Sequence, residues 1–562
     1  MDLQKRVDFW NDNITSDERK ILNSYQKYEI ENGFLKELEF GTAGVRAVMG
    51  IGPSYLNKYT IIRLTIAFFN YLKKNVLSQK FYEKGIVIFH DNRNNSAYFA
   101  SLVADIFSSF KVKVYLTKNN ELMPTPLLSF AVRELNAIAG IVITASHNPK
   151  EYNGFKIYNS FGAQLLPKET KLIQKEMEKI TDEFIFDFSF SKKSDFINEI
   201  DEEIILNYKN LVKNLALNSH LKKEIKLTFS AQHGTSYYLM PKILKELGYE
   251  VDLVKEQCVV DGNFTHTKCA NPEDKSAFEL SFQYAKKNDS DIIIMTDPDA
   301  DRLGVAVKNS EKDKYEILSG NTVASIMIYY LTTELKKQEK LPLNSVMYTT
   351  FVSGSLPSKI AEKHNVKTIL TPTGFKWMAK EIIENPKYKM VFAFEQAIGY
   401  LVSDFVLDKD SFQAAVLLVD LANYYKVKYN LSLLEVYENI QKEYGYYIEN
   451  DFSIVVKGLK GMEIFGKIME IFRTRRIKNI NNVFVLQKQD YLITFPKNDY
   501  KCNLIKYTVE DGWFAIRPSG TEPKIKIYLS ISSKNKEKCE EVYNKLKFGL
   551  NSFIKLKIEE FS

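Results

Sequence analysis

The feature that most constrains this chain is a pattern that occurs three times, an apolar run that ends abruptly in a polar loop. IAGIVIT (138–144) leads into ASHNPKEYNG, DIIIMT (291–296) into DPDADR, and KMVFAF (389–394) into EQAIGY. Unbroken apolar runs of this length are typical of buried parallel strands. Helical patterns alternate with the apolar runs along the chain, around 96–110, 275–287 and 411–425. The sequence therefore predicts an α/β protein with its sites at the carboxyl ends of strands.

The chain is too long for one hydrophobic core, because 562 residues correspond to several domains of ordinary size. Charged or turn-rich stretches begin near Ser189, Leu318 and Tyr444. They predict four segments, 1–200, 201–320, 321–448 and 449–562. The last differs from the others, since isolated strand-like pieces and a terminal helix from about Asn535 indicate a smaller α+β module. The pieces are 452–458, 483–487, 491–495, 513–517 and 524–531.

Composition excludes several functional classes. A net charge of +7, from 77 basic and 70 acidic residues, is too dilute for a nucleic-acid wrapper and suits anionic small molecules better. The four cysteines include no C-x-x-C pair, so neither a disulfide framework nor a zinc site is predicted. The N-terminus has no apolar signal region and no apolar stretch is long enough to span a membrane. We expect a cytoplasmic protein without nucleic-acid or membrane partners.

The first loop places a serine at the end of a predicted strand. In TASHNPKEYNGFKIY, Ser146 follows the apolar run, His147 is beside it, and Asn148-Pro149 makes a turn that would expose the hydroxyl. Ser146 could be a nucleophile, or the segment could be an ordinary turn. No G-x-S-x-G elbow is present, so an α/β-hydrolase is not supported.

The second loop, TDPDADRLG, carries Asp297, Asp299 and Asp301 at alternating positions. Three carboxylates this close repel one another unless a cation neutralises them, and hard oxygen ligands suit Mg²⁺. A calcium-binding EF-hand is excluded, because Arg302 and Lys308 stand where it requires Gly and Glu. The alternative is a solvated acidic turn.

A further polar segment, AIRPSGTEPKIKIY, combines the guanidinium of Arg517 with two hydroxyls and a glycine backbone, a combination that fits a phosphate group. A Pro-Ser-Gly turn with a surface arginine explains it equally well. The residues involved are Arg517, Ser519, Gly520 and Thr521. Weaker signals, each explained by a turn or a loop charge when taken alone, come from Arg46, Thr373, Gly374, Lys376, Glu395 and Lys409. His90, Arg93 and His233 are more typical of structural roles.

Taken together and in order, these motifs resemble the α-D-phosphohexomutase superfamily, the phosphoglucomutase and phosphomannomutase enzymes. TASHNPKEYNG resembles the family's phosphoserine loop, DPDADR its metal loop, FEQAIGY its sugar loop and RPSGTEPK its phosphate loop. The resemblance implies a heart-shaped arrangement of three related α/β domains and a smaller α+β domain around a central cleft. It also implies a mutase that interconverts the 1-phosphate and 6-phosphate of glucose, with mannose as a second candidate, through an enzyme phosphoserine and a sugar bisphosphate.

The resemblance carries roles to individual residues. Ser146 would bear the phosphoryl group, and one Mg²⁺ would be held by a phosphoserine oxygen together with Asp297, Asp299 and Asp301. Glucose 1,6-bisphosphate would act as activator and primer. The remaining catalytic candidates are His147, Lys156, Lys409 and Arg46. The substrate-binding candidates are Thr373, Gly374, Lys376, Glu395, Arg302, Arg517, Ser519, Gly520 and Thr521.

One departure from the family pattern leaves the substrate open. Many members have Glu-x-Ser in the sugar loop, whereas this chain has Glu395-Gln396-Ala397, a form that resembles the subgroup containing phosphopentomutases. The lost hydroxyl removes a hydrogen bond worth about 0.5 to 1.5 kcal/mol. A phosphopentomutase acting on ribose or deoxyribose 1-phosphate, a sugar-bisphosphate synthase and a non-catalytic phosphosugar-binding regulator therefore remain alternatives. In each case the partner is a small phosphosugar, and both a monomer and a homodimer are compatible with the sequence.

Overall fold

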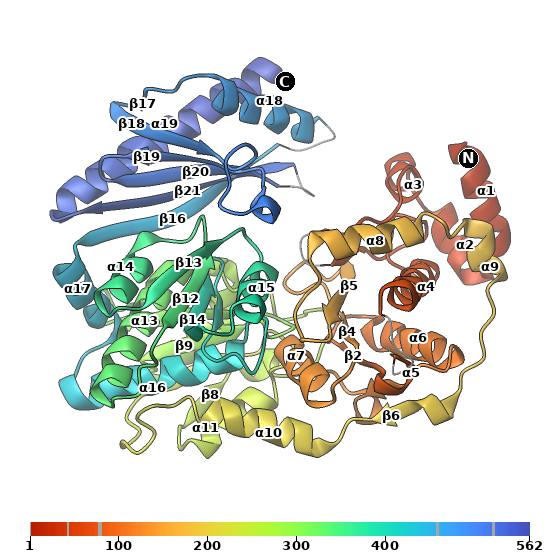
Figure 1. Cartoon of the computed structure of the whole chain (residues 1–562), viewed down its shortest axis with the longest axis horizontal. Helices are drawn as coiled ribbons and strands as arrows, with labels where there is room; N and C mark the ends of the chain where they lie inside the picture. The colour runs from red at the N-terminus through yellow and green to blue at the C-terminus, as the bar shows by residue number, and fades with distance from the viewer. Residues whose placement is uncertain (1, 42–43, 77–80, 457–459, 520–522) are drawn as a thin grey trace. The chain divides into compact units, whose positions relative to one another are not determined.

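The computed structural model describes residues 2–41, 44–76, 81–456, 460–519 and 523–562 (Figure 1). The chain divides into two compact units. The first comprises Met1–Lys308 with Gly399–Asp420, and the second comprises Asn309–Ile398 with Leu421–Ser562. Each unit contains two β-sheets with helices, as expected of an α/β chain with several cores.

The first sheet of the first unit is mixed. Its β2 is parallel to β3 and β4, while β5 returns antiparallel to β4. The strand order is β1 (Val45–Val48), β5 (Tyr152–Asn159), β4 (Ala139–Ile143), β2 (Ile86–His90), β3 (Val114–Leu116) and β6 (Ile197–Glu199). The helices of this part are α1 (Leu3–Asn13), α2 (Ser16–Asn23), α3 (Lys27–Phe34), α4 (Lys58–Asn75), α5 (Phe81–Lys84), α6 (Ser96–Ser109), α7 (Thr125–Glu134), α8 (Pro167–Met177) and α9 (Asp182–Asp187).

The second sheet of the first unit repeats this design. Its β7 is parallel to β8 and β9, and β10 returns antiparallel to β9. Its strands follow the order β10 (Leu303–Asn309), β9 (Ile292–Thr296), β7 (Leu227–Ser230) and β8 (Val251–Leu253). Helices α10 (Glu202–Lys213), α11 (Leu239–Glu246) and α12 (Glu279–Asn288) belong here. The returning segment brings β15 (Gly399–Leu401) and the start of α16 (Ser411–Tyr429).

The second unit begins with a sheet in which β12 is parallel to both β13 and β14. The strands are β13 (Lys367–Thr371), β12 (Ser345–Thr350) and β14 (Lys389–Glu395), and β11 (Lys314–Ile317) precedes them in the chain. The helices are α13 (Gly320–Lys337), α14 (Ser355–Lys363), α15 (Phe375–Glu384), the remainder of α16, and α17 (Leu433–Tyr444). The apolar runs predicted as strands thus form β4, β9 and β14.

The last sheet is antiparallel in all its described pairs, and α18 (Gly461–Thr474) and α19 (Lys536–Phe561) share its apolar core. Its order is β16 (Tyr446–Val455), β21 (Lys524–Ser533), β20 (Gly512–Pro518), β19 (Ile505–Val509), β18 (Val483–Asp490) and β17 (Asn479–Ile480). One predicted strand is wrong. Residues 491–493 form a turn and residues 494–495 have no regular structure, because the N–H groups of Ile493 and Thr494 donate back to Asp490 O at 3.0 and 2.8 Å instead of to a neighbouring strand. Residues 457 and 458 of another predicted strand lie outside the described residues.

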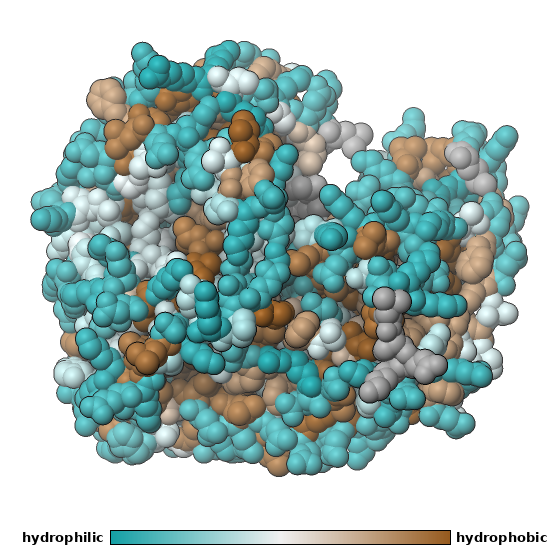
Figure 2. Space-filling view, in the orientation of Figure 1, coloured by the Kyte–Doolittle hydropathy of each residue, from teal (hydrophilic) through white to brown (hydrophobic). Residues whose placement is uncertain are grey.

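Short 3₁₀ helices complete the chain. They are η1 (Lys118–Asn120), η2 (Ser194–Phe196), η3 (Lys255–Gln257), η4 (Lys275–Phe278) and η5 (Asn498–Tyr500). In the part of the chain that the structure describes, no helix has the length and apolar content needed to cross a bilayer. Hydrophilic residues cover most of the face drawn in Figure 2, with hydrophobic ones interspersed among them.

Candidate active site

Ser146 lies in the turn that connects β4 to β5 in the first unit. Its backbone has φ +52°, a left-handed conformation that non-glycine residues seldom adopt, and its N–H donates to Thr144 Oγ1 at 2.9 Å. Ser146 is fully buried. Such a conformation persists only where the surrounding structure fixes it, and it occurs often at active sites. The sequence placed Ser146 after a strand but gave no sign of this strained backbone.

The hydroxyl of Ser146 donates to the carboxylate of Asp297, with 2.7 Å between Oγ and Oδ2. His147 Nδ1 lies 3.3 Å from the same Oγ. Burial, together with the charges of Arg302 and Arg46, holds the pKa of His147 well below its ordinary value, so the imidazole is neutral at pH 7. Burial and the neighbouring carboxylates of Asp299 and Asp301 raise the pKa of Asp297 well above the ordinary value. Serine and aspartate, 151 residues apart in sequence, therefore form one site.

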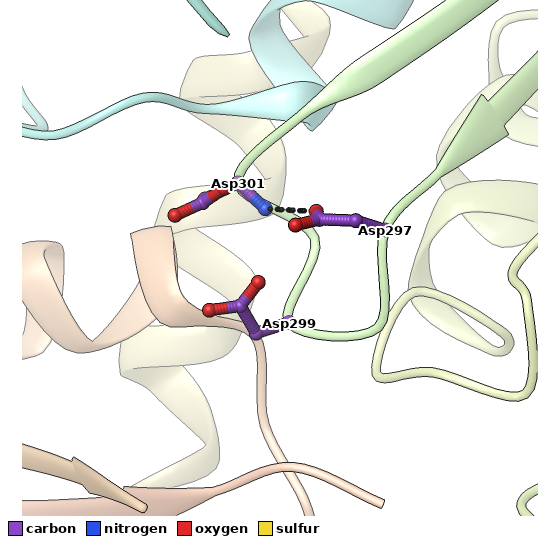
Figure 3. Close-up of side chains that lie close together, drawn as sticks. All are labelled: Asp297, Asp299 and Asp301. Atoms are coloured by element: carbon purple, nitrogen blue, oxygen red, sulfur yellow. Dashed lines mark hydrogen bonds between the residues drawn. The ribbon is translucent and has the colours of Figure 1, made fainter. Parts of the chain in front are cut away.

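The three predicted aspartates belong to the loop that joins β9 to β10 (Figure 3). All are buried, and each offers a carboxylate oxygen within 4.8 Å of the others. The loop is fixed from within, because the main-chain N–H groups of Asp301 and Arg302 donate to Asp297 Oδ1 at 3.1 and 3.0 Å. Ala300 at φ +58° makes the sharp turn between them.

The chemistry of this loop fits a metal ion. Oδ1 of Asp299 and Oδ1 of Asp301 are buried and accept no hydrogen bond from any residue that the structure describes. The ammonium of Lys156 lies 2.6 Å from Asp299 Oδ2 and 3.2 Å from Asp301 Oδ2, so a cationic group already neutralises the opposite side of the cluster. Buried carboxylate oxygens without donors are costly, and they are the ligands that hard divalent cations prefer. The aspartates can thus hold a metal ion.

Both predicted lysines lie beside this cluster. Lys409 Nζ is 3.2 Å from Asp301 Oδ2 and 3.2 Å from Asp408 Oδ1. Asp408 also accepts hydrogen bonds from Tyr158 Oη at 2.7 Å and Gln164 Nε2 at 2.6 Å. The sequence did not predict these contacts of Asp408, because Tyr158 and Gln164 belong to a segment some 250 residues away.

The charge state of Lys156 differs from what a catalytic base would need. Burial works against its ammonium, but the carboxylates of Asp299 and Asp301 raise the pKa of Lys156 overall. The same two neighbouring lysines, Lys156 and Lys409, hold the pKa of Asp301 well below its ordinary value despite burial. Lys156 is therefore a charged donor in this arrangement.

Other contacts hold the two loops in place. Arg46 Nη1 donates to Asn148 Oδ1 at 3.0 Å, and Arg302 Nη1 lies 3.7 Å from Glu273 Oε2. Thr125, at the start of α7, donates its N–H to Asp299 O and its hydroxyl to Asp299 Oδ2, at 3.0 and 3.1 Å. No sequence motif marks Thr125, which contributes through a contact across 174 residues.

The predicted sugar-binding residues lie in the second unit, at the end of β14. Glu395 is buried, and its Oε1 accepts the N–H of Gly374 at 2.8 Å. Gly374, at φ +115°, directly precedes α15, and Lys376 is buried in the first turn of that helix. Thr373 is half-buried beside them. The structure thus brings Glu395 and the 373–376 segment together.

The predicted phosphate-binding residues lie in the antiparallel sheet of the second unit. Arg517 is half-buried in β20, opposite Lys526 of β21. The N–H of Ser519 donates to Lys524 O at 2.9 Å and closes the connection between these strands. Gly520 and Thr521 lie outside the described residues.

Comparison with known proteins shows the family to which the chain is similar and supports the division into domains. Models of the phosphoglucomutase/phosphomannomutase family match its alpha/beta/alpha domains I, II and III at residues 37–184, 207–311 and 319–444, and its C-terminal domain at 478–542. A phosphoglucomutase of Staphylococcus aureus (strain N315) is 34% identical over 562 residues, covering 98% of this chain and 99% of that protein.

Solved structures support the fold. A phosphoglucomutase/phosphomannomutase family protein from Burkholderia thailandensis has a TM-score of 0.67 at 16% identity, covering 91% of this chain and 97% of its own. The open form of pp63/parafusin, a phosphoglucomutase from Paramecium, has a TM-score of 0.63 at 16% identity, with coverage of 94% and 95%. The predicted four-domain α/β architecture is confirmed.

Proposed function

Because this chain belongs to the phosphoglucomutase/phosphomannomutase family, we propose that it is a phosphosugar mutase that moves a phosphoryl group between the 1- and 6-hydroxyls of a hexose, glucose first and mannose second, by way of phosphorylated Ser146. The observation that carries the proposal is the buried hydrogen bond of 2.7 Å from Ser146 Oγ to Asp297 Oδ2 in the aspartate loop. A turn without a catalytic role has no need of a strained serine next to three carboxylates.

In the reaction, the phosphoserine gives its phosphoryl group to the free hydroxyl of a sugar monophosphate, and the bisphosphate returns its other phosphoryl group to Ser146. In the second step Ser146 Oγ bonds to phosphorus, the bond from phosphorus to the sugar oxygen breaks, and the serine proton ends on that oxygen. Asp297 orients the serine hydroxyl. Lys156, charged beside the aspartates, donates to the sugar oxygen as it leaves phosphorus, and Lys409 is the second candidate for handling the proton there.

Asp297, Asp299 and Asp301 would hold one Mg²⁺ together with an oxygen of phosphorylated Ser146. When bound, the ion offsets negative charge on the transferring group. Arg46 and Arg302 would orient the phosphoserine loop. Arg46 donates a hydrogen bond to Asn148 in that loop, and the positive charges of both arginines lower the pKa of His147. Neutral His147 would remain a hydrogen-bonding neighbour of Ser146 rather than a cation.

The residues of the second unit would recognise the substrate. Glu395, with Thr373, Gly374 and Lys376, would bind the sugar hydroxyls. The phosphate group that does not react would be held by Arg517, Ser519, Gly520 and Thr521. Because the bisphosphate must present both of its ends to Ser146, glucose 1,6-bisphosphate would serve as activator and primer.

The second candidate is a phosphopentomutase, favoured by Glu395-Gln396-Ala397 in the sugar loop. Gln396 is buried there, and its Oε1 accepts hydrogen bonds from Thr350 and Ser353 at 3.3 and 3.4 Å. The amide of Gln396 is therefore occupied by hydrogen bonds to residues near the end of β12. Ala397 has no hydroxyl with which to bind a sugar. A smaller sugar with fewer hydroxyls would lose less by that change.

The deciding experiment is a phosphorus NMR competition with glucose, mannose and ribose 1-phosphates, Mg²⁺ and a trace of glucose 1,6-bisphosphate. Appearance of glucose 6-phosphate ahead of the other products supports the hexose mutase. Preferential conversion of ribose 1-phosphate would assign the pentomutase instead. No conversion of any sugar, with the protein folded, would contradict both assignments.

A further inference from the structure

Behind the turn that carries Ser146 lies buried Arg93, which the sequence pattern marked only as typical of a structural role. Arg93 donates from Nη2 to the main-chain carbonyls of Ser146, at 2.7 Å, and Asn148. Its Nη1 donates to the carbonyls of Pro149 and Tyr152, at 2.7 and 2.9 Å. One guanidinium thus binds four carbonyl oxygens of the turn, which therefore converge on it.

Only an arginine can make this set of contacts. A guanidinium offers five N–H donors in a planar fork, whereas a lysine ammonium offers three on a flexible stem. The side chain of Arg93 is fully buried, with Nε 3.2 Å from Oδ2 of the equally buried Asp91. Asp91 Oδ1 in turn accepts from the N–H of Arg93 and from Ser96 Oγ, at 2.9 and 2.7 Å. The guanidinium is therefore held by Asp91, directly after β2, as well as by the carbonyls of the turn that carries Ser146.

The remaining face of Arg93 is covered by Phe264, which comes from the region of the second sheet. The guanidinium carbon lies 5.1 Å from the centre of the Phe264 ring, within the range of a cation–π contact. Phe264 is buried and has a left-handed backbone at φ +52°. Asn92 Nδ2 donates to Asp261 O at 2.9 Å and ties the loop of Phe264 to the segment of Arg93.

We propose that Arg93 is a positioning residue for phosphoryl transfer and that Phe264 holds it in place. The proposal rests on the function proposed above. Four carbonyls bound to one cation fix the left-handed turn of Ser146, and this turn directs Oγ to Asp297. The loop of Phe264 belongs to the same sheet region as the aspartates, so it couples the position of the serine to the part of the fold that carries them.

The proposal predicts a loss of rate without a loss of sugar affinity. Arg93→Lys keeps the charge but cannot bind four carbonyls, so the turn relaxes and Ser146 Oγ shifts away from the transfer geometry. A shift of this kind costs about a hundredfold in rate. We expect that loss both in the rate at which glucose 1,6-bisphosphate phosphorylates Ser146 and in kcat, with KM for the sugar phosphate within about twofold of the original value.

Phe264→Leu is the milder second variant. It keeps apolar bulk over the guanidinium but removes the ring face, and we expect about a tenfold loss in the same two rates. In the double variant the loss should not exceed that of Arg93→Lys alone, because both changes act through one contact. Arg63→Lys is the matched control: Arg63 is equally buried in the first unit but bonds Glu37 and Asp182, so it should lower Tm and leave kcat unchanged.

Rates are expressed per folded molecule, from circular dichroism of each preparation. Unchanged phosphorylation of Ser146 in Arg93→Lys, with only Tm lowered, would overturn the inference and leave the proposed function intact. If KM rises and kcat falls to the same extent in Arg93→Lys, Phe264→Leu and the control Arg63→Lys, the inference is also overturned, because that result reports general destabilisation. Failure of the unmodified protein to acquire phosphate on Ser146 would overturn the proposed function and this inference together.

Discussion

The serine and aspartate site of the first unit differs in construction from the residues of the second unit that are proposed to bind the substrate. We call the latter the recognition residues; they are Thr373, Gly374, Lys376, Glu395, Arg517 and Ser519 together with Gly520 and Thr521, which lie outside the described residues. Ser146, Asp297 and Asp299 are buried; Ser146 bonds Asp297, and Asp299 contacts Lys156 and Thr125. In the second unit the recognition residues are divided between two sheets. The proposed reacting groups are therefore joined by direct contacts within one unit, whereas the described members of the proposed recognition set lie on two separate sheets.

The difference follows from the cost of buried charge. A carboxylate removed from water requires partners, and those partners also fix its position. Fixed charges at the reacting group stabilise a transition state without reorganisation, which is where an enzyme gains most. Arg517 and Ser519 are only half-buried, so a smaller desolvation cost constrains their positions. The comparison predicts that substitutions in the first set change rate and those in the second set change affinity.

The largest effect is expected from Asp299→Asn. The substitution removes one charge from the aspartate cluster, while the amide oxygen can still accept from Thr125 and Lys156 retains Asp301. Turnover should fall about a thousandfold, with Tm nearly unchanged. Steady-state kinetics at saturating Mg²⁺ and a thermal melt test this, and an equal loss of stability and activity would count against it.

Asp182→Asn should have the opposite effect to Asp299→Asn: it should lower stability and leave turnover unchanged. Asp182 is a buried carboxylate far from the site in sequence, bonded to Arg6, Trp10 and Arg63. Removing its charge leaves Arg6 and buried Arg63 with Glu37 as their one remaining carboxylate among the described residues, so the free energy of unfolding should fall by about 3 kcal/mol with kcat retained. Urea unfolding with parallel assays measures both, and a fall in kcat with stability retained would contradict the comparison.

The pH dependence of that effect has a definite sign. Burial alone would raise the pKa of Asp182, but hydrogen bonds from Arg6 and Trp10 and the charge of Arg63 lower it overall. The stabilisation is present above the pKa of the unfolded chain, about 4, and is lost as pH falls through the folded value. The gap in stability between the original protein and Asp182→Asn should therefore narrow below pH 4.

Arg517→Ala tests the recognition side. If the guanidinium holds the phosphate that does not react, the contact exists in the ground and transition states alike, and KM should rise about tenfold or more with kcat nearly kept. Arg473→Ala is the control in the same sheet region, because Arg473 bonds Asp490 and Asn503 instead. A fall in kcat without a change in KM would contradict the recognition role of Arg517.

The smallest effect concerns Lys506, a basic residue of the second unit that the catalytic proposal does not use. Its ammonium donates to Phe351 O at 2.9 Å and lies 3.7 Å from the centre of the Trp513 ring. Burial lowers the pKa of Lys506 to about 8, although Glu449 opposes the shift. Between pH 8 and about 10 the unfolded chain binds a proton that the folded chain does not, so Lys506 makes stability rise with pH.

Lys506→Met removes that group, so the Tm of the original protein relative to the variant should increase between pH 8 and about 10. Differential scanning calorimetry across this window measures the difference, and kcat at pH 7 serves as the internal control. Identical pH profiles of Tm would show that Lys506 titrates normally.

The sequence predicted which residues lie together at the candidate site better than the contacts that hold them in place. The apolar runs located Ser146, Asp297 and Glu395, because a strand that ends in polar residues is a local pattern. The clamp of Arg93 and the brace of Thr125 were not predictable, since both depend on contacts across 53 to 174 residues. Residues 491–495 were wrongly predicted as a strand, because a run of apolar residues carries no sign of the turn that the N–H groups of Ile493 and Thr494 close onto Asp490 O.

In the proposed reaction Ser146 carries the phosphoryl group from one sugar to the next. The direct measurement is incubation with glucose 1,6-bisphosphate labelled in both phosphates, followed by peptide mapping and a chase with unlabelled glucose 1-phosphate. The account predicts label on Ser146, its release into sugar bisphosphate during the chase, and no label in Ser146→Ala. Turnover that continues without label on Ser146, or label on another residue that chases at the rate of turnover, would contradict it.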